Sequence, residues 1–163
     1  MISDSALRDQ LLQLLRGGHA HMSFEEAVED FPAELLNSQP PNIPFTTWRL
    51  LEHMRLAQWD ILEFIRNPEH VSPDWPEGYW PPEGAQADRQ AWETSLSAFR
   101  ADALALQELV ANPRTDLTAD LPHAPGYSIL REILVVSDHN AYHIAELALL
   151  REMLGAWPDE GSE

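Results

Sequence analysis

The amino-acid sequence predicts an all-α protein, a four-helix bundle that spans residues 1–163 as a single domain. Three long segments repeat apolar residues with a period of about 3.6, which is typical of helices with one buried face. A shorter segment near the N-terminus does the same and is broken at Gly17-Gly18. No stretch of the sequence predicts a β-strand, and it contains no internal repeat. With 163 residues and 44% hydrophobic content, the chain can bury enough apolar surface to fold without a stabilising cross-link.

The first bundle helix is expected in two pieces. The first piece begins at Ser3 or Asp4, either of which can cap it, and ends at the glycine pair. Ser23 and Glu26 then form a capping-box pattern, in which each side chain bonds a free backbone amide at a helix start. The helix that follows is short, because Pro32 breaks it.

Three long helices complete the bundle. They are predicted from Thr46 or Thr47 to about Arg66, from about Ala85 to Val110, and from Tyr127 or Ser128 to Met153 or Leu154. Gly155 suits the position after the last helix, since glycine readily adopts the left-handed conformation that ends many helices. The connections are long, which leaves room for a bundle in which consecutive helices are not always neighbours.

The connections are rich in proline and lie at residues 38–44, 67–84 and 112–126. The middle one is also rich in Trp and Gly and is predicted to form a long irregular loop. Loops of this length inside a compact domain are often functional. We expect its aromatic residues Trp75, Tyr79 and Trp80 to fold back onto the bundle.

The charge balance excludes several classes of partner. Ten Lys+Arg against 27 Asp+Glu give a formal net charge of −17 and a pI near 4.6. Cationic side chains supply most of the affinity for nucleic acids and for anionic membranes, so we expect neither partner. No apolar run approaches the roughly 18 residues of a membrane span, and the N-terminus does not resemble a signal peptide. We therefore expect a cytoplasmic protein.

Histidines on two of the long helices form a candidate metal site. His139 and His143 are spaced i and i+4, which places their Cβ atoms about 5–6 Å apart on one face of the last helix. The same stripe carries Glu132, Val135, Val136, Glu146, Leu147 and Leu150 and is expected to face the bundle. His53 lies on the inward side of the second bundle helix. Bundle cores routinely assemble metal sites from facing helices, and the alternative is that all three are core histidines with protein partners.

Cysteine and two common metal-binding motifs are absent from the sequence, which excludes several kinds of metal site. The sequence has no cysteine, so a metal site must use imidazole and oxygen ligands and any thiol must come from outside. It has no Glu-x-x-His motif, which excludes the ferritin-like di-iron pattern. Asn140 stands where the His-Glu-x-x-His metalloproteases carry their general base. The remaining histidines His19, His21, His70 and His123 lie in predicted loops and are expected at the surface, although the first two could approach the site.

Two motifs resemble the DinB/YfiT superfamily: Leu50-Leu-Glu-His53, and Ser137-Asp-His-Asn-Ala-Tyr-His143-Ile-Ala-Glu-Leu at the end of the chain. With the broken first helix and the Trp-Pro loop, the resemblance covers essentially the whole sequence. It implies an up-down-down-up four-helix bundle, often a homodimer, with His53, His139 and His143 on one Zn or Ni ion. Family members with known activity include thiol-dependent S-transferases and a maleylpyruvate isomerase.

One departure from the family pattern concerns Glu146. Family members usually carry Gly-Gln where this sequence has Ala145-Glu146, so this carboxylate could tune the site, ligate the metal or face solvent. Asp60, one heptad beyond His53, is the other carboxylate placed to act as a base or as a hydrogen-bond partner of a ligand. The alternative for both is an ordinary acid on a helix surface.

Three imidazoles leave an open coordination position, which is typical of catalytic rather than structural zinc. A metal lowers the pKa of bound water towards about 7 and deprotonates a bound thiol. We therefore predict a metal-dependent enzyme, of the S-transferase or hydrolase kind, in which water or an exogenous low-molecular-weight thiol attacks a small electrophilic substrate. The rival hypothesis is a non-catalytic metal-binding or stress-associated homodimeric scaffold, whose open position would be plugged by Trp75, Trp80 or Glu146.

Overall fold

The computed structural model describes residues 2–158. Its elements are α1 (Asp4–Arg16), α2 (Phe24–Val28), η1 (Ala33–Leu35), α3 (Thr47–Arg66), η2 (Glu77–Tyr79), α4 (Arg89–Ala111), β1 (Asp120–Leu121), β2 (Ala124–Ser128) and α5 (Ile129–Leu154). α1 and α2 together make the predicted first bundle helix, and α3, α4 and α5 are the three long helices. The all-α bundle is therefore confirmed.

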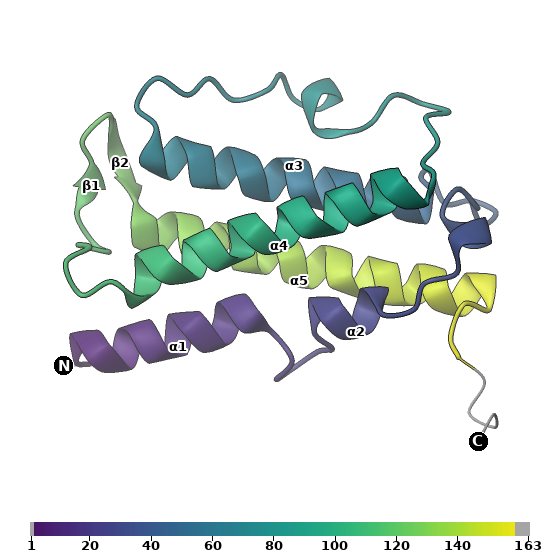
Figure 1. Cartoon of the computed structure of the whole chain (residues 1–163). Helices are drawn as coiled ribbons and strands as arrows, with labels where there is room; N and C mark the ends of the chain where they lie inside the picture. The colour runs from purple at the N-terminus through teal and green to yellow at the C-terminus, as the bar shows by residue number, and fades with distance from the viewer. Residues whose placement is uncertain (1, 159–163) are drawn as a thin grey trace.

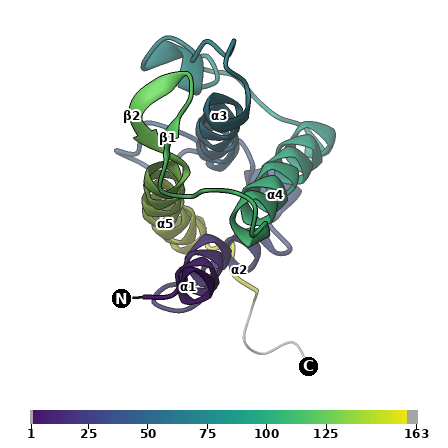
Figure 2. The same ribbon diagram turned by 90° about the vertical axis from the view of Figure 1, so that its left-hand side faces the viewer.

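The helices follow the up-down-down-up order. α1 and α5 run in one direction along the bundle, and α3 and α4 run in the other (Figure 1). Seen from the end, α3 and α1 occupy opposite corners, with α4 and α5 at the corners between them (Figure 2). The segment between α3 and α4 runs back along α3, so that α4 begins at the end of the bundle where α3 began.

Local sequence sets where the helices begin and end. Ser3, Ser23, Thr46, Asp88 and Ser128 each accept a hydrogen bond from a backbone amide in the first turn of α1, α2, α3, α4 and α5 respectively. The predicted capping box is present, because Glu26 also accepts a hydrogen bond from the amide of Ser23 at 2.6 Å. Gly155 ends α5 with a φ of 61°, a conformation that costs glycine little.

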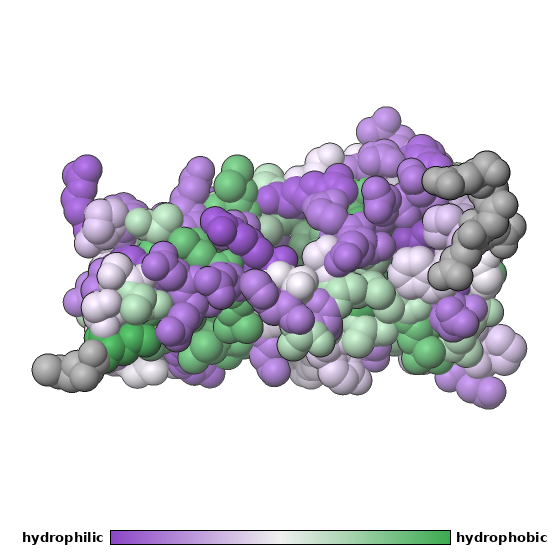
Figure 3. Space-filling view, turned by 90° about the horizontal axis from the view of Figure 1, so that it is seen from below, coloured by the Kyte–Doolittle hydropathy of each residue, from purple (hydrophilic) through white to green (hydrophobic). Residues whose placement is uncertain are grey.

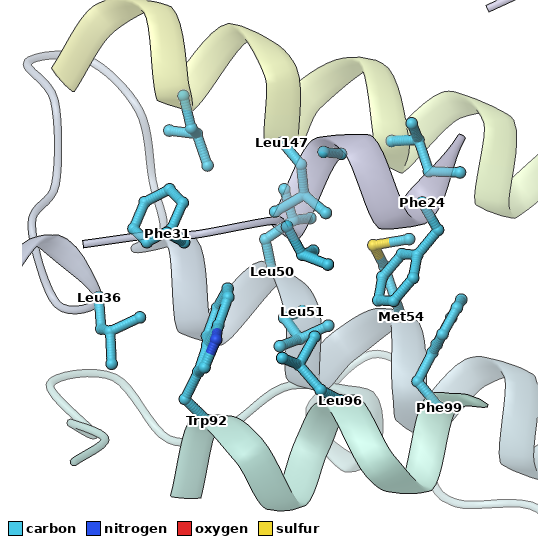
Figure 4. Close-up of a cluster of buried hydrophobic side chains, with 14 of the residues drawn as sticks. Phe24, Phe31, Leu36, Leu50, Leu51, Met54, Trp92, Leu96, Phe99 and Leu147 are labelled. Carbon is cyan, nitrogen blue, oxygen red and sulfur yellow. The ribbon is translucent and has the colours of Figure 1, made fainter. Parts of the chain in front are cut away.

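A hydrophobic cluster holds α3 against α4, α5 and the segment that contains α2 (Figure 4). Its labelled members are Phe24, Phe31, Leu36, Leu50, Leu51, Met54, Trp92, Leu96, Phe99 and Leu147, all buried. The rings of Phe24 and Phe99 stack with centroids 4.1 Å apart. Each such side chain contributes about 1.5–3 kcal/mol on burial, so the relative positions of α3 and α5, which carry the histidines, are well determined.

Two predicted details of the fold are wrong. α4 begins at Arg89 rather than near Ala85, because Asp88 caps it. The segment before α5 contains a short antiparallel hairpin of β1 and β2, although no strand was predicted. Strands of two and five residues are too short for an alternating apolar pattern to reveal them.

The prediction that Val135 faces the bundle is also wrong, because this residue is exposed on α5. The exposed apolar side chains of α5 are Leu134, Val135, Tyr142, Leu149 and Met153. A helix that is apolar on several sides carries a weak periodic signal, so its buried face is hard to predict from sequence. Seen from below, the molecule likewise shows apolar residues scattered among polar ones (Figure 3). Within residues 2–158, no helix is long and apolar enough to cross a membrane.

Candidate metal centre

Three imidazoles meet between α3 and α5. The Nε2 atom of His53 lies 3.1 Å from Nε2 of His143 and 3.2 Å from Nε2 of His139. The ligand atoms of the three side chains all lie within 4.8 Å of one another. His53 and His143 are buried, and His139 is partly exposed. The structure thus brings together the three predicted residues, which we call the histidine cluster.

The outward-facing Nδ1 atoms of the histidine cluster have hydrogen-bond acceptors beside them. His53 Nδ1 donates to the carbonyl oxygen of Tyr79 at 2.9 Å, and His143 Nδ1 donates to Glu146 Oε2 at 2.7 Å. His139 Nδ1 lies 3.4 Å from the amide oxygen of Asn140, a longer contact. A carbonyl and a carboxylate cannot donate, so the protons of the neutral His53 and His143 rings sit on Nδ1. The Nε2 atoms of His53 and His143, which lie 3.1 Å apart, then point lone pairs at each other.

The local environment keeps the histidine cluster neutral. Burial lowers the pKa of His53, His139 and His143 from 6.5 to about 4, and for His53 and His139 the repulsion between neighbouring imidazoles lowers it further. At neutral pH, the lone pairs of His53 and His143 therefore face each other without a proton between them. Nitrogen ligands on a tetrahedral zinc ion, each about 2.0–2.1 Å from it, lie roughly 3.3 Å apart. The two distances from His53 Nε2 are close to this spacing, so the cluster could hold a metal ion.

Aromatic residues of the loop between α3 and α4 cover one side of the histidine cluster. The indole of Trp80 stacks on the imidazole of His53, with centroids 4.0 Å apart and an angle of 3° between the rings. Phe45 stacks on Trp80 in turn, at 5.3 Å. Trp80 and Tyr79 fold back onto the bundle as predicted, but the side chain of Trp75 is 72% exposed.

A pocket of about 430 Å³ opens beside the cluster. Its walls are formed by His53, Ala57, Asp60, Ile61, Trp75, Tyr79, Trp80, His139 and His143. The pocket therefore reaches all three imidazoles, and one of the two predicted carboxylates lies in its wall. Pockets of this kind, mostly apolar with a few convergent polar groups, are the usual form of a small-molecule site.

Asp60 contributes to the site through the loop. One carboxylate oxygen accepts a hydrogen bond from the Tyr79 hydroxyl at 2.6 Å, and the other accepts one from His70 Nε2 at 2.7 Å. Burial and this carboxylate together raise the pKa of Tyr79 to about 12. Asp60 thus anchors the residue whose backbone carbonyl orients His53. The prediction that His70 lies at the surface is wrong, because its side chain is only 8% exposed.

Glu146, the second predicted carboxylate, lies directly beside the histidine cluster. Its side chain is 27% exposed, and Oε2 accepts a hydrogen bond from the outer nitrogen of His143 at 2.7 Å. Burial raises the pKa of the Glu146 carboxyl, while a hydrogen bond from Tyr142 opposes this shift. Carboxylates in this position fix the tautomer of a metal-binding histidine and increase its basicity.

The family model that describes the DinB superfamily matches residues 16–147 of this sequence. This chain belongs to the DinB superfamily. The matched segment includes α3, α4 and the part of α5 that carries His139 and His143, so every member of the histidine cluster lies within it. No curated protein and no solved structure matches the chain.

Other parts of this DinB-superfamily site were not predicted from the sequence. The carbonyl oxygen of Tyr79 and the stacked ring of Trp80 come from an irregular loop whose path no periodicity reveals. Asn140, which lies beside His139, also donates to Gln58 on α3 at 2.9 Å and so links the two helices. His19 and His21 line a different pocket, at the break between α1 and α2, and His123 bonds the carbonyl of Phe64.

Proposed function

We propose that His53, His139 and His143 together bind one divalent metal ion, zinc or nickel. Neutral imidazoles are favoured ligands of both ions, and this sequence has no thiolate that would favour another donor set. The observation that supports the proposal best is the meeting of three Nε2 atoms at 3.1 and 3.2 Å, with no proton between those of His53 and His143. Buried lone pairs in contact are unfavourable unless a proton or a cation lies among them.

We further propose that the site is catalytic and acts on a small electrophilic molecule. A divalent ion held by three imidazoles supplies an open position at which a water molecule or an exogenous thiol becomes a stronger nucleophile. The substrate would lie in the adjoining pocket, with Glu146 holding His143 and Asp60 holding the Tyr79 loop. S-transfer and hydrolysis both fit this arrangement.

The rival role as a non-catalytic scaffold requires a plugged metal position. Trp80 lies against the ring face of His53, and Glu146 is bonded to the outer nitrogen of His143. Trp75 is largely exposed, at 72%. None of the three candidate plugs fills the pocket beside the Nε2 atoms, so the geometry favours an enzyme.

The experiment begins with protein purified without an affinity tag, because a polyhistidine tag would bind metal itself. Elemental analysis should find about one divalent ion per chain. The loaded protein is then screened with pairs of one thiol and one alkyl halide or epoxide, with loss of free thiol as the readout. Hydrolysis of activated esters is measured in parallel. Stoichiometric metal without turnover of any pair or ester would favour the scaffold, and absence of metal would refute both roles.

The proposed partner is a small molecule, not a nucleic acid or a membrane. A net charge of −17 opposes binding to phosphate backbones and to anionic lipids. The homodimer implied by the family resemblance stays a proposal, which sedimentation equilibrium would test directly.

A further inference from the structure

The walls of the pocket beside the histidine cluster lack a cationic side chain. Within the described part of the chain, no arginine lines this pocket, and the whole sequence contains no lysine. Among the described wall residues, the ionisable one besides the histidines and Tyr79 is Asp60, whose carboxylate accepts two hydrogen bonds. A carboxylate or phosphate on a ligand would therefore find no counter-ion in the walls.

The proposed metal does not change this conclusion for a ligand that binds as a thiolate. Asp60 lies in the pocket wall and Glu146 bonds His143, so the formal charges of these two carboxylates would balance those of a divalent ion. The thiolate itself then leaves the site with an excess negative charge. A second anionic group on the same ligand would be repelled in a partly desolvated pocket, where charges interact more strongly than in water.

The remaining walls are suited to an apolar ring. Ala57, Ile61, Trp75, Tyr79 and Trp80 supply apolar and aromatic surface around about 430 Å³. An apolar cavity of about 150 Å³ is large enough to bind benzene, so this pocket has room for a benzyl group and its substituents.

Among these aromatic residues, Trp75 is the most exposed. Trp80 already stacks with His53 and with Phe45, and the Tyr79 hydroxyl is bonded to Asp60. The ring of Trp75 lies 5.5 Å from that of Tyr79, at 57°, and 72% of the residue is exposed. An exposed indole in a pocket wall gains contact area when a flat ligand enters.

We propose that the pocket takes a thiol or substrate that carries an aromatic group and no anionic group, and that Trp75 contacts the ring of this ligand. The proposal rests on the metal-dependent function above, because the reacting end of the ligand would lie at the metal. A cationic substituent is tolerated, since indole rings attract cations and the nearby carboxylates are negative.

A matched series of thiols tests this selectivity. The protein is loaded with cobalt(II), whose absorption spectrum changes when a thiolate binds. Phenylmethanethiol is compared with its para-carboxylate and its para-aminomethyl derivative, and 2-sulfanylethanol serves as the small thiol without a ring. We expect the neutral and cationic aromatic thiols to bind at least about tenfold more tightly than the carboxylate, because of the charges that face the pocket.

Variants of the loop test the role of Trp75. Trp75→Ala should weaken binding of phenylmethanethiol about fivefold to tenfold and leave 2-sulfanylethanol unchanged, because only the ring contact is lost. Trp75→Phe should keep most of the affinity. Val71→Ala is the matched control, since Val71 lies in the same loop, is 85% exposed and is not part of the pocket wall.

The outcomes separate this inference from the function on which it rests. If 2-sulfanylethanol changes the cobalt spectrum while the carboxylate binds as tightly as its neutral analogue, the charge selectivity is refuted and the metal site stands. If Trp75→Ala binds phenylmethanethiol like the unmodified protein, the ring contact is refuted. If cobalt does not bind, or no thiol changes its spectrum, the thiol-binding metal site itself is wrong and the inference is overturned with it.

Discussion

Imidazoles are buried in two neighbouring places in this protein, with opposite hydrogen-bonding outcomes. His70 has a side chain that is 8% exposed, and its Nε2 donates to Asp60 at 2.7 Å. In the histidine cluster, the Nε2 atoms lie against one another instead of against a carboxylate oxygen. The first arrangement is complete with protein atoms alone, whereas the second calls for a ligand from outside. Burial alone therefore does not distinguish a structural histidine from a metal ligand, but the partner of its inner nitrogen does.

Removal of one member of the histidine cluster should have the largest effect on metal binding. We expect His143→Ala to weaken binding of zinc or nickel by at least about a hundredfold, because a three-ligand site loses a ligand and the orienting carboxylate of Glu146 loses its target. His53→Ala and His139→Ala should behave alike. Isothermal titration calorimetry on tag-free protein measures the loss, and His123→Ala is the control because His123 bonds a backbone carbonyl elsewhere. Stoichiometric metal retained by His53→Ala would refute the three-histidine site.

Acid should destabilise the metal-free protein through the same residues. The pKa values of the three imidazoles are lowered from 6.5 to about 4 in the folded protein. Between these values the unfolded chain binds more protons than the folded chain, so the free energy of unfolding decreases as the pH falls through this window. The contribution is complete above about pH 6.5 and lost near pH 4. Calorimetric melting of chelator-treated protein across this range measures the slope.

The matched control for the pH series replaces all three imidazoles with amides, as His53→Gln, His139→Gln and His143→Gln together. This variant should show a much smaller loss of melting temperature between pH 6.5 and 4. Equal slopes in the two proteins would mean that other groups cause the acid sensitivity, and the neutral state assigned to the cluster would lose its support.

Glu146 should have a smaller effect than the ligands, because it acts through His143. Removing a carboxylate that orients a metal-binding histidine typically weakens the metal about tenfold to a hundredfold, and we expect Glu146→Ala to fall at the lower end. Glu146→Gln keeps an acceptor oxygen for His143 Nδ1 and should lose less. Competition with a chromophoric zinc chelator measures both variants. A larger loss in Glu146→Ala than in His143→Ala would show that Glu146 itself ligates the metal.

The sequence predicted the helical framework and the histidine cluster for one physical reason. Helical periodicity places residues on a face, so the spacing of His139 and His143 and the inward stripe around His53 could be read directly. The loop between α3 and α4 has no such periodicity, and its contacts to Asp60 and to His53 Nδ1 depend on its path in space. The predicted exposure of His70 is wrong for the same reason, because the burial of a loop residue depends on the path of the loop in space.

Replacement of His70 should have the smallest effect on the metal centre, because His70 bonds a carboxylate and not the other imidazoles. His70→Ala leaves Asp60 without one of its two hydrogen-bond partners, and losing such a buried partner costs about 1–3 kcal/mol of stability. Asp60 still accepts the hydrogen bond from the Tyr79 hydroxyl, so the carbonyl that orients His53 should stay in place. The variant should therefore melt at a lower temperature and still bind a full equivalent of metal with unchanged affinity. His70→Asn, whose amide can still donate to the carboxylate, should recover part of the melting temperature. A His70→Ala protein that melts normally but loses its metal would reverse the two roles and make His70 part of the metal centre.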